Sequence, residues 1–127
     1  MRVRRLDHVL LAMPAGRESE ARVFYQGILG IPEIIKPSDL AGRGGCWFED
    51  GELKIHLGVE KNFIPAKKAH PAFIVDDLAA LSSALTTAGF PISHDAPLEG
   101  YDRIFVHDPS GNRIELIELK VSEAPAP

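Results

Sequence analysis

Four residues of metal-binding types recur at matching spacings along the chain. His70 follows His8 by 62 positions, and Glu115 follows His56 by 59 positions. Three imidazoles and one carboxylate suit a borderline divalent cation such as Mn, Fe, Co, Ni or Zn. Such a cation can polarise a carbonyl group or activate a bound oxygen. We therefore predict that these four residues hold one divalent metal ion.

Each of these residues has a structural interpretation as well. A single histidine in a strand is more often structural than a ligand, and Glu115 fits the pattern of an exposed glutamate on a half-buried strand. The repeated spacing favours the metal. His94 lies outside the repeat and is expected at the surface. His107 shares strand parity with Arg103 and Phe105, in a row that either lines a pocket or faces solvent.

The helix and strands that position His8 and His56 can be predicted from apolar periodicity and turn residues. Apolar residues from Ala21 to Leu29 recur with a helical period, and Asp50-Gly51 is a strong hairpin signal. We expect a strand over Val3–Met13, a helix over Arg17–Leu29, a short strand over Pro32–Lys36, and strands over Cys46–Glu49 and Glu52–Gly58.

The second half of the chain repeats this order. Asp76 or Asp77 can cap a helix that Gly89 ends. The residues from Asp108 to Asn112 form a turn. We expect strands over His70–Val75, Pro91–His94, Tyr101–His107 and Arg113–Leu119, and a disordered tail over Val121–Pro127.

The residues that end the two predicted helices match, which indicates an internal repeat. The first helix ends in Leu29-Gly30-Ile31-Pro32 and the second in Ala88-Gly89-Phe90-Pro91. The fold class is therefore predicted as α+β, with two βαβββ modules at about residues 3–60 and 68–120. Together the two modules make a single domain over residues 1–120.

Composition narrows the function classes. The 127 residues are 45% apolar and 25% charged, which is typical of a globular chain. A formal net charge of −4 argues against nucleic acid as a partner. No apolar run approaches the ~20 residues of a membrane span. Cys46 is the single cysteine, so no intrachain disulfide can form and a cytoplasmic location is expected.

Several segments carry a resemblance to a known family. The chain resembles the vicinal oxygen chelate superfamily, which includes glyoxalase I, extradiol dioxygenases, fosfomycin-resistance enzymes and bleomycin-resistance proteins. The resemblance implies paired βαβββ modules whose sheets form a cupped, incomplete mixed β-barrel around a metal, commonly in a homodimer. The segments are Leu6–Val9, Phe24-Tyr25 with Leu29-Gly30, His70–Phe73 with Val75–Asp77, and Asp108–Leu116.

Position by position, the resemblance also implies roles. His8, His70 and Glu115 match the metal triad of the fosfomycin and dioxygenase branches. His56 departs from glyoxalase I, which carries a carboxylate at this position. Because carboxylates at that metal serve in proton transfer, the resemblance implies Glu115 or His56 as the proton-transfer base. Phe105 stands where the fosfomycin branch carries a tyrosine.

The leading functional hypothesis is a glyoxalase-like, metal-dependent enzyme that acts on a small oxygenated substrate by lyase, isomerase or dioxygenase chemistry. Arg103 is the candidate for binding a substrate carboxylate, and Phe105 is the candidate for an apolar wall. The alternative is a non-catalytic protein of the bleomycin-resistance type that binds and sequesters a small molecule.

Overall fold

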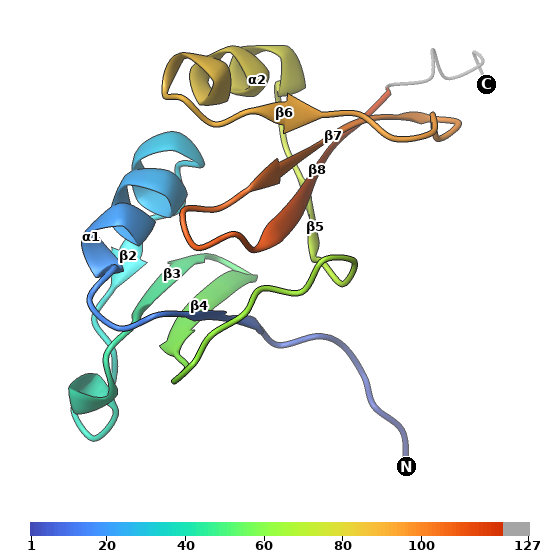
Figure 1. The fold of residues 1–127 in the computed structure, drawn as a ribbon. Coiled ribbons are helices and arrows are strands. Elements are labelled where there is room, and N and C mark those ends of the chain that lie inside the picture. Colours follow the sequence, from blue (N-terminus) through green and yellow to red (C-terminus); the bar gives the residue numbers. More distant parts are fainter. Residues whose placement is uncertain (121–127) are drawn as a thin grey trace. The chain divides into compact units, whose positions relative to one another are not determined.

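The computed structural model describes residues 1–120 and divides into two compact units, one up to Pro65 and one from Ala66 onward. The boundary falls within the linker expected between the modules. The tail predicted over Val121–Pro127 lies outside the described residues. Each unit contains a helical segment and a four-stranded mixed sheet, so the βαβββ repeat predicted from the sequence is confirmed (Figure 1).

The first unit has the sheet order β1-β4-β3-β2, in which β1 and β4 are parallel and the other pairs are antiparallel. Its elements are β1 (Val9–Met13), α1 (Glu18–Ala21), the π-helix η1 (Arg22–Ile28), β2 (Glu33–Ile34), the 3₁₀ helix η2 (Ala41–Arg43), β3 (Cys46–Asp50) and β4 (Leu53–Val59).

The helix of the first unit is wider than the sequence predicted. The amide of Leu29 bonds to the carbonyl of Phe24, and the amide of Ile31 bonds to that of Tyr25, so the turns are longer than α-helical turns. Neighbouring residues of an α-helix point about 100° apart. The wider turn lets the adjacent Phe24 and Tyr25 both lie fully buried, with Tyr25 stacked on Phe48 of β3.

The first strand is shorter than predicted. The sequence predicted a strand over Val3–Met13, but β1 begins at Val9. Residues 1–8 are all exposed and have no strand partner within the described residues 1–120. Four of the first seven residues are charged, and such side chains are rarely buried by a sheet. His8 therefore immediately precedes the strand instead of lying within it.

The second unit repeats the topology with the sheet order β5-β8-β7-β6. The strands predicted over Tyr101–His107 and Arg113–Leu119 have the bounds that the sequence predicted. The strands predicted over His70–Val75 and Pro91–His94 are shorter, because only their central residues pair. Its elements are β5 (Ala72–Ile74), α2 (Leu78–Thr87), β6 (Ile92–Ser93), β7 (Tyr101–His107) and β8 (Arg113–Leu119).

Local signals at the ends of the second unit's elements are confirmed. The Asp77 side chain accepts a hydrogen bond from the amide of Ala80 and caps α2. The Asp108 carboxylate accepts hydrogen bonds from the amides of Ser110 and Asn112 and so closes the β7–β8 turn. The Asp108 turn fixes the register of the hairpin that carries Glu115.

The architecture belongs to the α+β class, as predicted. Within residues 1–120, no helix has the length and apolar character that a membrane crossing requires.

Candidate functional site

The first unit presents a histidine pair on one face of its sheet. His56 lies in β4, and His8 immediately precedes β1. Side chains alternate between the faces of a strand, so His56 points away from the buried Ile55 and Leu57 that flank it. The rings of His8 and His56 stack with their centroids 4.5 Å apart. The structure therefore brings these two predicted ligands side by side.

Two residues of β3 hold His56 from the neighbouring strand. Trp47 lies directly opposite His56 in the antiparallel ladder, and the two rings stack at 3.8 Å with an interplanar angle of 2°. Glu49 lies diagonally opposite, within the reach of a long side chain. His56 Nε2 donates a hydrogen bond to Glu49 Oε2 at 2.7 Å. His56 thus has a ring against its face and a carboxylate at its edge.

Asp7 is the partner of His8, with its Oδ2 atom 3.0 Å from His8 Nδ1. This hydrogen bond lowers the pKa of the Asp7 carboxyl, and the charge of Lys54 adds to the effect. Because a carboxylate accepts the hydrogen bond, Nδ1 carries the proton and Nε2 of the neutral ring keeps a lone pair. Carboxylate partners of this kind orient metal-binding histidines in many proteins.

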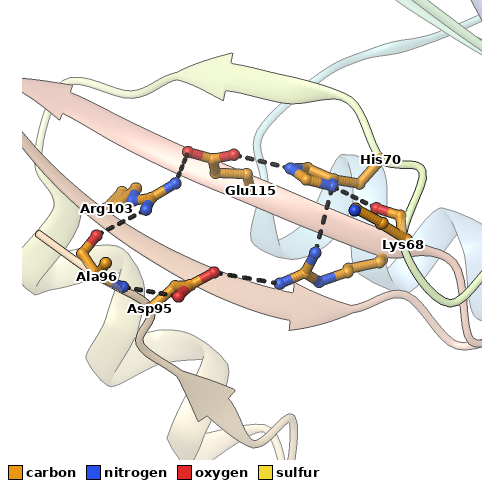
Figure 2. Close-up of polar contacts among 7 residues, drawn as sticks. Lys68, His70, Asp95, Ala96, Arg103 and Glu115 are labelled. Atoms are coloured by element: carbon orange, nitrogen blue, oxygen red, sulfur yellow. Dashed lines mark hydrogen bonds and ion pairs between the residues drawn. The ribbon is translucent and has the colours of Figure 1, made fainter. Parts of the chain in front are cut away.

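The second unit pairs a histidine with a carboxylate. His70 lies two residues before β5, and Glu115 lies in β8 and is 6% exposed. His70 Nε2 lies 2.8 Å from Glu115 Oε1, and His70 Nδ1 lies 2.7 Å from the carbonyl oxygen of Lys68 (Figure 2). The structure therefore also brings the second pair of predicted ligands together.

Arg103 holds the other oxygen of Glu115. Its Nη1 donates to Glu115 Oε2 at 3.2 Å, and its Nη2 donates to the carbonyl of Ala96 at 2.6 Å. Figure 2 shows Glu115 placed between Arg103 and His70. Within the part of the chain that the structure describes, the buried Nε of Arg103 has no hydrogen-bond partner. An unpartnered buried donor costs about 1–3 kcal/mol, so an acceptor placed beside it would be stabilised.

Phe105 and Arg113 form the apolar and cationic flank of this pair. Phe105 lies directly opposite Glu115, is 2% exposed and meets the ring of His70 edge-on at 5.2 Å. The Arg113 guanidinium lies 4.0 Å from the centre of the Phe105 ring, and its Nη1 is 3.4 Å from His70 Nδ1. That nitrogen cannot donate to Lys68 and accept from Arg113 at once. The shorter contact, with the carbonyl, is the hydrogen bond.

The His70–Glu115 pair fits a divalent cation. Because His70 Nδ1 donates to the Lys68 carbonyl, Nε2 of the neutral ring carries a lone pair. That lone pair then faces a carboxylate oxygen, which is also an acceptor, across 2.8 Å. Two acceptors at this distance need a positive charge between them, either a proton or a metal ion. Imidazole nitrogen and carboxylate oxygen are both donors that zinc and similar metals accept.

The four predicted ligands therefore form two pairs, one in each unit. Among residues 1–120, no group of three or more His, Cys, Asp or Glu side chains has an arrangement that could hold a metal ion. Ligation of one metal by all four residues stays a prediction. The two remaining histidines, His94 and His107, are both exposed.

Sequence reasoning missed the partners of these residues. The signal for Glu49 was present: a hairpin turn at Asp50-Gly51 places Trp47, Glu49 and His56 on one face of the sheet. The contact between His70 and Lys68 had no such signal, because every residue carries a backbone carbonyl.

Comparison with known proteins assigns the family. The sequence model of the Glyoxalase/Bleomycin resistance protein/Dioxygenase superfamily matches residues 5–116. A lactoylglutathione lyase of Haemophilus influenzae is 32% identical over 117 residues, which covers 80% of this chain and 84% of the relative.

Solved structures support the same assignment. The crystal structure of a putative glyoxalase family protein from Bacillus anthracis is 46% identical, with a TM-score of 0.88 over 94% of this chain and 98% of that one. The fosfomycin resistance protein FosX of Listeria monocytogenes, at 17% identity, shares the fold with a TM-score of 0.73 over 96% of this chain and 98% of that one. The chain belongs to the Glyoxalase/Bleomycin resistance protein/Dioxygenase superfamily.

Proposed function

We propose that this protein is a glyoxalase-like enzyme that acts on a small oxygenated substrate through one divalent metal ion held by His8, His56, His70 and Glu115. The observation that carries the proposal is the His70–Glu115 pair. The backbone carbonyl of Lys68 commits His70 Nδ1 to donation, and His70 Nε2 faces Glu115 Oε1 across 2.8 Å. The stacked pair of His8 and His56 supplies the remaining donors.

Each residue around these ligands has a proposed task. The metal, when bound, supplies a Lewis acid that polarises a substrate oxygen. Arg103 binds a substrate carboxylate or carbonyl oxygen, and its unpartnered Nε supports this role. Phe105 excludes water beside Glu115. Glu115 or His56 accepts the substrate proton and returns it to a neighbouring carbon.

The name of the Haemophilus influenzae relative suggests the first substrate to test. Methylglyoxal and glutathione form a hemithioacetal, whose isomerisation to lactoylglutathione moves one proton from the sulfur-bearing carbon to its neighbour and the hydroxyl proton from the oxygen of the first carbon to that of the second. The step is redox-neutral overall and needs no co-reactant. His56 is the feature that sets this chain apart, so a panel of other 2-oxoaldehyde adducts and of catechols belongs in the same experiment.

Metal analysis tests the proposal directly. Protein purified without chelators is expected to carry about one equivalent of a divalent transition metal per chain. The substitutions His8→Ala and His70→Ala are expected to remove most of it. The matched controls His94→Ala and His107→Ala change exposed histidines outside the proposed set and are expected to retain the metal.

A metal content below ~0.2 equivalents that is unchanged by His8→Ala would overturn the proposal, because loss of a ligand weakens binding beyond the 10–100-fold effect of an outer partner. Tight binding of a small molecule that survives complete removal of metal, without turnover, would instead indicate a sequestration protein.

We also propose that the protein forms a homodimer in the cytoplasm. Family resemblance supports the dimer, and the single, buried Cys46 is compatible with a reducing compartment. Light scattering is expected to give twice the chain mass of 13.9 kDa. A mass of one chain at micromolar concentration would contradict the dimer.

A further inference from the structure

The environment of His56 restricts how its ring can lie. His56 is 6% exposed, and its ring stacks on two others. The centroid of the Trp47 ring lies 3.8 Å away at an interplanar angle of 2°, and that of His8 lies 4.5 Å away at 21°. Stacking on both rings holds the plane of the imidazole. A half-turn about the Cβ–Cγ bond would keep that plane and exchange Nδ1 with Cδ2 and Nε2 with Cε1, so stacking alone does not decide where the nitrogens point.

Glu49 determines the orientation of the ring nitrogens of His56. The hairpin of β3 and β4 pairs Trp47 with His56 and Glu49 with Lys54, so Glu49 is the diagonal neighbour of His56 on the same face. Its Oε2 lies 2.7 Å from His56 Nε2. A carboxylate oxygen can only accept, so Nε2 must carry the proton. In the neutral ring the lone pair then lies on Nδ1.

This assignment is the reverse of that of the other two histidines. His8 and His70 use Nδ1 to donate, to the Asp7 carboxylate and to the Lys68 carbonyl. Nε2 of the neutral His8 ring then has the lone pair, whereas His70 Nε2 faces Glu115 Oε1 with a proton or a metal ion required between them. His56 uses Nε2 to donate and leaves Nδ1. Each of the three rings therefore has one nitrogen committed to an oxygen acceptor.

The net charge of the Glu49–His56 pair equals that of a carboxylate. Glu49 and a neutral His56 together carry one negative charge, which is what a single carboxylate at position 56 would carry. The pair differs from a carboxylate in the atom that it presents, which is a nitrogen backed by an anion.

We propose that Glu49 is a positioning residue that fixes His56 in the Nε2–H tautomer, so that His56 acts through Nδ1. The Glu49–His56 pair then takes the place of a carboxylate in the site. The proposal deepens the proposed function and rests on it for what Nδ1 binds. The tautomer itself is a property of the metal-free protein.

Nitrogen-15 NMR of the full chain without metal tests the tautomer. The wild-type protein is expected to show a proton on His56 Nε2 that exchanges slowly with water, because it is hydrogen-bonded and buried. Glu49→Leu is expected to lose this protection. Glu49→Gln, which keeps the shape and an acceptor oxygen, is expected to retain part of it and guards against misfolding of the leucine variant.

Zinc affinity, measured by competition with a chromophoric chelator, tests the consequence. Glu49→Leu is expected to weaken zinc binding about 10–100-fold, as the loss of an outer partner does. Glu49→Gln is expected to fall between the leucine variant and wild type. Glu52→Gln is the matched control, because Glu52 is exposed and, among the residues that the structure describes, forms an ion pair with Arg5 alone, at 3.4 Å.

The outcomes separate the two proposals. A proton on His56 Nδ1, or zinc affinities within twofold of wild type for both Glu49 variants, would overturn the role of Glu49. A protected Nε2 proton in a protein that binds no zinc would uphold the pair and refute the metal-dependent function.

Discussion

The two units use one scaffold to support ligand candidates whose neighbours have opposite charges. In the first unit an aromatic residue, Trp47, lies directly opposite His56, and the diagonal neighbour Glu49 is an anion. In the second unit an aromatic residue, Phe105, lies directly opposite Glu115, and the diagonal neighbour Arg103 is a cation. The same cross-strand geometry thus serves an imidazole in one unit and a carboxylate in the other.

The difference teaches what each level of structure controls. Hairpin register determines which positions meet, because opposite and diagonal neighbours follow from the turn alone. Charge compensation then determines which residue types are tolerated at those positions, because a buried ionic or polar group needs a partner. A histidine at position 56 is therefore accompanied by an acid, whereas a glutamate at position 115 is accompanied by a base.

The largest expected effect comes from removing the anion of the second unit. Glu115→Ala leaves the part-buried guanidinium of Arg103 without its carboxylate, and breaking a buried ion pair from one side costs about 3–5 kcal/mol. Urea denaturation followed by circular dichroism measures this loss. Glu115→Gln keeps acceptor and shape and should cost less. A loss below ~1 kcal/mol for the alanine variant would mean that Arg103 relaxes into solvent.

The same substitution in the first unit should cost less. Glu49→Ala leaves His56 Nε2 without an acceptor, but a neutral ring is easier to leave unpaired than a guanidinium. The expected loss in the free energy of unfolding is about 1–3 kcal/mol, by the same urea measurement. Equal losses for Glu49→Ala and Glu115→Ala would argue that partner charge is not what distinguishes the units.

The helices of the two units provide a smaller contrast. Asp77 caps α2 through the amide of Ala80, whereas Arg17 before α1 makes no side-chain cap. Asp77→Ala should therefore cost about 1 kcal/mol, whereas Arg17→Ala, at an exposed position, should cost little. Thermal unfolding of the two variants gives the comparison. Equal shifts in melting temperature would show that the cap contributes nothing.

The last effect is absent at neutral pH and concerns the core of the first unit in alkaline solution. Burial, with the charge of Glu33 adding to it, raises the pKa of the Cys46 thiol from 9.0 to about 11. Between these values the unfolded chain releases the proton and the folded chain keeps it, so stability falls as pH rises from about 9 to about 11. Urea titrations should show a shallower fall for Cys46→Ala. Parallel curves for the two proteins would contradict this assignment.

Local signals predicted most of the fold because they act within a few residues. The turns at Asp50-Gly51 and at Asp108 to Asn112 set both hairpins, and β7 and β8 match the prediction to the residue. The strand predicted from Val3 was too long because apolar character does not show whether a partner strand exists. The π-helical turns were missed because they depend on how Phe24 and Tyr25 fill the core.

By itself, the sequence determined the repeat, the α+β class, the family resemblance and the four ligand candidates, because spacing, turn residues and period are properties of the chain. Only the tertiary structure decided which partner each candidate meets. The carbonyl of Lys68 commits one nitrogen of His70, and Glu49 commits one nitrogen of His56. Such choices depend on which oxygen atoms folding brings within about 3 Å, the hydrogen-bonding range.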